Sequence, residues 1–143
     1  MATKIPVQDR RADCVLSCGQ RAEVQRRPLA PQEVTGREAH TDLWVLDCTA
    51  AHRCGRVLVW EDPRFGQLFR WDHAWKGFAA AKRPIFLNLS LDLATGKGNF
   101  REVTSWNFEG YRAHGTVRTH TAAAMRSWMR YGAPLTQGEG SAR

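Results

Sequence analysis

The sequence has no long apolar run. The longest stretches without a charged residue, such as PIFLNLSL at 84–91, are far shorter than the roughly 20 apolar residues that cross a bilayer. The opening MATKIPVQDRR also lacks the apolar segment of about 7 to 15 residues that marks a secretory signal. These absences predict a cytoplasmic protein without a membrane partner, in which cysteine thiols stay reduced.

Aromatic residues are missing from the beginning of the chain. All 14 of them lie between Trp44 and Tyr131, so the first 43 residues bring no large ring to a core. We therefore expect residues 1–43 to form an N-terminal arm, residues 44–135 to form the folded domain and residues 136–143 to be a mobile tail.

Motifs for catalysis are missing as well. Gly96-Lys97 is not preceded by the glycine, nor followed by the Ser or Thr, that a phosphate-binding loop requires. The chain has no nucleophile elbow, no His-Glu-x-x-His and no His-x-Glu of the zinc deaminases. Asp72-His73 has no second metal ligand close behind it. An enzyme is therefore the less favoured interpretation.

The residues that are present predict mostly strands. LWVLDC and GRVLVWED are rich in β-branched and aromatic residues and predict a hairpin around the loop between them. Pro63 and Gly66 predict a turn into QLFRW, and the alternation of PIFLNLSLDL predicts a strand at 84–93 that returns, after a turn at 94–99, through residues 100–108.

Two helices are expected beside these strands. Asp72 is the predicted cap of a short helix through HAWKGFAAAK, and Thr121 of a longer one that ends at Tyr131. The predicted fold class is α+β, with an antiparallel sheet or small barrel of five to six strands and the C-terminal helix packed on it.

Four cysteines form two pairs, each followed by glycine: Cys14 with Cys18, and Cys48 with Cys54. Each pair resembles half of a zinc ribbon, in which the second thiolate lies where the chain reverses direction. The resemblance covers about residues 13–60, with three and five residues between the cysteines in place of two. It implies a structural zinc with four thiolate ligands, and His40 or His52 could replace one of them. A disulfide and free thiols remain as alternatives.

The positive charge is concentrated in the second half of the chain. Residues 73–143 hold 10 Lys and Arg against 4 Asp and Glu, whereas residues 1–72 are nearly balanced. Arginine suits bidentate contact with phosphate, and exposed rings stack on bases. Trp75, Phe78 and Tyr111 are the rings expected at the surface. The predicted nucleic-acid-binding residues are Arg70, Lys97, Arg101, Tyr111, Arg112, Arg118, Arg126 and Arg130.

This pattern supports two expectations for function. The first is a small basic nucleic-acid-binding protein, accessory to a bacterial or phage nucleic-acid machine, with DNA and RNA both open as ligands. The second is a protein–protein interaction module that inhibits or adapts another complex by binding an acidic protein surface, because tryptophan and arginine are common in interface hot spots. The sequence alone does not separate the two.

Overall fold

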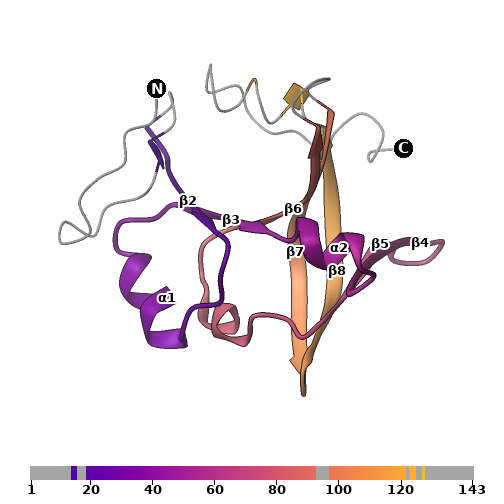
Figure 1. The fold of residues 1–143 in the computed structure, drawn as a ribbon, viewed down its shortest axis with the longest axis horizontal. Helices are drawn as coiled ribbons and strands as arrows, with labels where there is room; N and C mark the ends of the chain where they lie inside the picture. Colours follow the sequence, from indigo (N-terminus) through magenta and orange to yellow (C-terminus); the bar gives the residue numbers. More distant parts are fainter. Residues whose placement is uncertain (1–13, 16–18, 93–96, 122, 125–126, 128–143) are drawn as a thin grey trace.

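The computed structural model describes residues 14–15, 19–92, 97–121, 123–124 and 127 (Figure 1). Eight strands are assigned within them: β1 (Cys14–Val15), β2 (Arg21–Gln25), β3 (Leu43–Asp47), β4 (Val57–Asp62), β5 (Gly66–Asp72), β6 (Ile85–Asp92), β7 (Lys97–Glu109) and β8 (Arg112–Thr121). The helical elements are α1 (Pro31–Arg37), α2 (Thr49–Arg53) and the 3-10 helix η2 (Lys76–Ala80). None of the helices in this part of the chain is long and apolar enough to cross a membrane.

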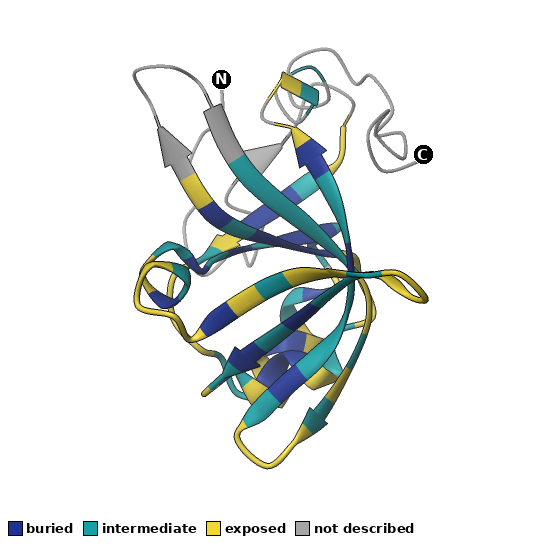
Figure 2. Cartoon of the chain, turned by 90° about the vertical axis from the view of Figure 1, so that its right-hand side faces the viewer, coloured by how far each residue is buried: buried dark blue, intermediate teal, exposed yellow. Residues whose placement is uncertain are grey.

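All eight strands belong to one mixed sheet in the order β1-β2-β3-β6-β7-β8-β5-β4. The pairs β2–β3 and β3–β6 are parallel, and the other neighbouring pairs are antiparallel. Figure 1 shows β7 and β8 between the β2–β3–β6 part on one side and the β4–β5 hairpin on the other, and Figure 2 shows how strongly the sheet curls.

The predicted fold class is therefore wrong in strand number and in strand direction. The expected antiparallel sheet or barrel of five to six strands is a larger mixed sheet with open edges. The strand at 84–93 and the turn into QLFRW are confirmed, as β6 and as the β4–β5 hairpin. The expected helix from Thr121 to Tyr131 lies almost wholly outside the described residues.

The predicted hairpin around CTAAHRCG is also wrong. Its Thr-Ala-Ala-His-Arg core forms the short helix α2, and the strands on its two sides are separated in the sheet by four others. Because parallel neighbours cannot be joined by a tight turn, β3 reaches its parallel partner β6 only after the chain has formed α2, the β4–β5 hairpin and η2.

The main core lies on one face of the sheet, which we call the helix-bearing face. Val34 of α1, Ala51 of α2 and Phe78 of η2 are buried there against alternate residues of the strands. The Trp44 and Phe78 rings meet edge to face at 5.0 Å. A smaller cluster around Phe86 occupies the other face. Phe78, expected at the surface, is therefore a core residue, because η2 turns it inward.

The N-terminal third contributes to the same sheet and core. β2 pairs in parallel with β3, and Val34 of α1 is fully buried. Arg21 and Asp42 form a two-pronged ion pair, with Nε to Oδ2 and Nη2 to Oδ1 both at 3.0 Å. The hydrogen bonds from Arg21 lower the pKa of Asp42 to about 2. These polar contacts join the beginning of β2 to the beginning of β3.

Candidate functional site: a cleft beside the open edge of β7

The predicted arginines do not all share one face. Strand register places Arg70 opposite His114 and Arg118 opposite Glu102, so that Arg70, Arg112 and Arg118 share the face opposite the helices. Arg101 pairs in register with Leu87 and belongs to the helix-bearing face.

The three arginines that share a face already have acidic partners. Asp72 Oδ1 lies 2.8 Å from Arg112 Nε and 3.6 Å from Arg70 Nε, and Glu102 Oε1 lies 3.5 Å from Arg118 Nη1. The charge that the sequence predicts on this face is therefore largely compensated by aspartate and glutamate from the same strands.

The remaining predicted contacts are scattered. Arg101 is half-buried, which lowers its pKa, and its Nη1 donates to Asn99. Tyr111 is exposed in the β7–β8 turn, with the Arg112 guanidinium 5.5 Å from its ring centre. The side chains of Lys97, Arg126 and Arg130 lie outside the described part of the structure.

The cysteines of the second pair lie at opposite ends of α2. Cys48 is buried before the helix, Cys54 is exposed after it, and both are free thiols. Cys18 and the side chain of Cys14 lie outside the described residues. The described residues contain no group of three or more His, Cys, Asp or Glu arranged for a metal. The four-cysteine zinc site stays a prediction.

The two described thiols are expected to differ strongly in reactivity. Burial raises the pKa of Cys48 to about 12, whereas a hydrogen bond from Arg56 Nε, 3.4 Å from the sulfur, lowers the pKa of Cys54. Since the thiolate is the nucleophile, iodoacetamide at pH 8 should alkylate Cys54 in the native protein and Cys48 only after unfolding. Peptide mass spectrometry measures both rates, and Arg56→Ala should slow the reaction of Cys54. Equal native rates for the two thiols would contradict this assignment.

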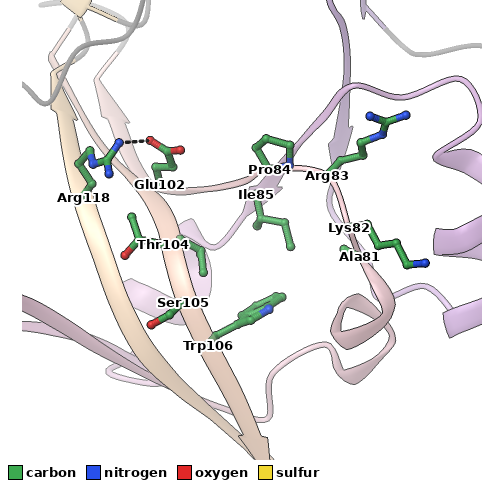
Figure 3. Close-up of a pocket in the computed structure, with 11 residues that line it drawn as sticks. Ala81, Lys82, Arg83, Pro84, Ile85, Glu102, Thr104, Ser105, Trp106 and Arg118 are labelled. Carbon is green, nitrogen blue, oxygen red and sulfur yellow. Dashed lines mark ion pairs between the residues drawn. The ribbon is translucent and has the colours of Figure 1, made fainter.

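A cleft of about 440 Å³ opens between β7 and the segment that leads from η2 into β6 (Figure 3). Its walls are formed by Ala81, Lys82, Arg83, Pro84, Ile85, Glu102, Val103, Thr104, Ser105, Trp106 and Arg118. In Figure 3, Ile85 and Trp106 extend into the space between the two walls, whereas the side chains of Lys82 and Arg83 leave the segment on the side away from β7. The volume falls in the range of ordinary ligand sites, about 300 to 1,000 Å³.

The cleft exists because β7 extends beyond β6. The ladder between them reaches Phe86 opposite Glu102, and β6 begins at Ile85. Beyond that point β8 is the one strand of the described residues that pairs with β7, and a register shift between Val103 and Ser105 marks a bulge at Thr104. We call the side of β7 from 104 to 109 that faces away from β8 the open edge.

The turn after β7 determines which backbone groups point to this edge. Gly110, at φ +60°, occupies the first corner of the two-residue turn between Glu109 and Arg112. In such a turn the two flanking residues, Glu109 and Arg112, bond to each other through their backbone groups. Along β7, every second residue from Glu109 then points its N–H and C=O toward β8, and the residues in between point theirs to the other side. Ser105 and Asn107 therefore bond to β8, while the N–H and C=O of Trp106 and Phe108 point to the open edge. Within the described chain no backbone hydrogen bond is found there.

A buried glutamate holds in place the wall of the cleft that faces β7, which is the segment before β6. Glu38, at the end of α1, accepts hydrogen bonds from Trp44 Nε1 at 2.8 Å, from the backbone N of Lys82 at 3.0 Å and from that of Arg83 at 3.0 Å. These bonds join the segment before β6 to the core on the helix-bearing face. The backbone that carries Lys82 and Arg83 is thus fixed, while both side chains are exposed.

A small charged network lies at the end of the cleft that Glu102 and Arg118 line. His120 Nε2 lies 2.9 Å from Glu102 Oε1, and this hydrogen bond, with Arg118 nearby, lowers the pKa of Glu102. Lys82 and Arg83 form no ion pair within 4.0 Å in the described residues, although the charge of Arg83 contributes to the lowered pKa of Asp42. With three cations against one carboxylate, the cleft has a positive balance.

Among the predicted site residues whose side chains the structure describes, only Arg118 lines this cleft. Sequence reasoning missed Lys82, Arg83 and Glu38. The dipeptide Lys82-Arg83 directly before Pro84 and the strongest predicted strand was the available signal for a basic segment beside the cleft. Nothing local to Glu38 indicates its role, because its partners lie up to 45 positions away.

Comparison of the chain with family models, with curated proteins and with solved structures gives no match. Function is therefore inferred from the residues of this chain alone.

Proposed function

We propose that the protein is an interaction module that binds an acidic segment of another protein in the cleft beside β7. The observation that carries the proposal is the combination of an open strand edge, an apolar cleft wall at Ile85 and Trp106, and two exposed cations, Lys82 and Arg83, on the segment that forms the other wall. Main-chain groups of an exposed edge supply affinity in peptide recognition, and neighbouring pockets supply specificity.

The arrangement supports a protein partner more than a nucleic acid. A phosphate backbone would have to displace Asp72 from Arg70 and Arg112, and Glu102 from Arg118, before those arginines could contact it. The exposed cations at the cleft instead lie beside a strand edge, which nucleic acid does not extend. Nucleic-acid binding, the first expectation from the sequence, stays an untested prediction.

Selection of random 12-residue peptides displayed on phage tests the proposal. We expect acidic peptides to be enriched on the wild-type protein, and their affinity to fall about tenfold or more in Lys82→Glu/Arg83→Glu, because like charges at an interface are repulsive. Arg53→Glu/Arg64→Glu is the matched control, since it changes the net charge equally at exposed positions outside the cleft.

The same proteins should be titrated with a labelled twenty-residue oligothymidylate. Acidic peptides that bind the control pair as they bind wild type, with oligothymidylate bound more weakly, support the proposal. Failure to enrich acidic peptides, an equal loss in both double variants, or tighter binding of the oligothymidylate than of any peptide would contradict it.

A further inference from the structure

We infer that the acidic segment binds as an additional β-strand, antiparallel to β7, with its C-terminal end at Lys82 and Arg83. This inference rests on the proposed function and specifies how the same cleft is used.

The backbone supplies the first argument. Trp106 and Phe108 each direct one N–H and one C=O to the open edge, so four hydrogen-bonding groups are available at the spacing of a β-ladder. Natural proteins commonly block such edges with lysine, proline or a bulge. Here the bulge lies at one end, near Thr104, and the sequence Ser-Trp-Asn-Phe-Glu that follows contains neither lysine nor proline.

The position of β6 supplies the second argument. β6 runs antiparallel to β7 and begins at Ile85, so the space beside Trp106 and Phe108 lies in line with β6, before its first residue. A strand in that space can extend the β6–β7 ladder, and its end near β6 is bounded by the segment that contains Pro84.

The charges around the cleft determine in which direction the added strand runs along β7. In a strand that runs as β6 does, the C-terminal end lies beside the segment 82–84, where Lys82 and Arg83 are exposed. Its N-terminal end lies toward the exposed Glu109. The opposite direction would place the amino end near the cations and the carboxyl end near Glu109. Electrostatic complementarity therefore selects the antiparallel direction and an acidic C-terminal end.

The two faces of the sheet supply the side-chain pattern. On the helix-bearing face the incoming strand adjoins Ile85 and Trp106, which suit apolar side chains. On the other face it adjoins Ser105 and Asn107, both exposed and polar. Because strand side chains alternate between faces, the matching segment alternates apolar and acidic residues.

Amide hydrogen exchange measured by NMR tests strand addition directly. The probe is a synthetic octapeptide of alternating valine and glutamate with a free C-terminal carboxylate, added to the labelled 143-residue chain. We expect the Trp106 and Phe108 amides to exchange about tenfold or more slowly in the complex, as buried ladder amides do. The Asn107 amide, already bonded to β8, is the internal control and should change little.

Two N-methylated forms of the octapeptide provide the chemical control. Methylation of alternate residues removes the N–H groups on one side of the strand only. We expect one form to lose about tenfold or more in affinity and the other to bind nearly as the parent does, since only one side faces β7. Equal affinity of the two forms would overturn strand addition.

The outcomes separate the inference from the proposed function. If the octapeptide binds but the Trp106 and Phe108 amides exchange at their free rates, strand addition is wrong and the acidic-partner proposal stands. If neither the octapeptide nor any displayed acidic peptide binds, both fail. Protection of these amides that increases with protein concentration, without any peptide, would identify a second copy of the chain as the occupant and overturn the inference.

Discussion

Gly77→Ala is expected to lower the free energy of unfolding by about 3 kcal/mol, an effect at the upper end of the range for overpacked cores. A Cβ on this buried residue would lie 1.8 Å from the carbonyl oxygen of Leu29 and 2.9 Å from its carbonyl carbon. The obstacle is backbone, so no side-chain rotation can relieve it. The segment before α1 and the helix η2 would have to move apart, and both border the main core.

Urea denaturation measures the loss, and Gly36→Ala is the matched control. Gly36 lies exposed in α1, and a methyl group on its Cα would have nothing within 4 Å. Alanine there should raise stability by about 0.5 to 1 kcal/mol, because glycine has the greater entropy in the unfolded chain. Wild-type stability in Gly77→Ala would show that the two segments are not in close contact.

Glu38→Ala is expected to cost a comparable amount, about 3 kcal/mol. It removes the acceptor for the buried indole N–H of Trp44 and for the backbone N–H groups of Lys82 and Arg83. An unsatisfied buried donor costs about 1 to 3 kcal/mol, and part of this loss is recovered where water can reach the backbone groups. Denaturation of the purified variant gives the loss.

Glu38→Gln separates the stability role from the positioning role. Glutamine keeps one acceptor oxygen and nearly the same shape, so the protein should fold with a smaller loss of stability. Because it cannot accept from all three donors, we expect the wall at 82–83 to shift and acidic peptides to bind more weakly. A stability loss in Glu38→Ala no greater than in Gln32→Ala, an exposed position of the same helix, would contradict the role given to Glu38.

Local sequence patterns correctly predicted one strand and one turn of this fold. The two-residue alternation from Ile85 onward became β6, and Pro63 with Gly66 marked the turn of the β4–β5 hairpin. Both signals depend on residues a few positions apart, where backbone geometry and sequence correspond directly.

The errors occurred where distant contacts decide the structure. β2 escaped prediction because it buries the charged Glu23 and exposes the apolar Val24. Glu23, buried in β2, is satisfied by Arg37 and by Thr41 at 3.1 Å, partners that lie 14 and 18 positions away. Similarly, strand propensity on both sides of α2 suggested a hairpin, because nothing in those residues reveals that β3 pairs with β6 instead.

The candidate site was also predictable only in its local features and not in its long-range contacts. The aromatic character of β7 and the basic residues near Pro84 are visible in the sequence, but their meeting across a cleft is not. It depends on β6 beginning where it does relative to the longer β7, and on a glutamate of α1 holding the segment in between. The predicted arginines failed to form one positive surface because Asp72 compensates Arg70 and Arg112, and Glu102 compensates Arg118.

The strand order also has a consequence for biosynthesis. The β4–β5 hairpin is synthesised before β6 and β7, yet its neighbour in the sheet is β8, the last strand of the described chain. A nascent chain that has not released β8 from the ribosome can form that hairpin, but it cannot join it to β6 and β7. Completion of the sheet therefore follows translation of β8, and until then the apolar side of the hairpin cannot be buried against the rest of the sheet.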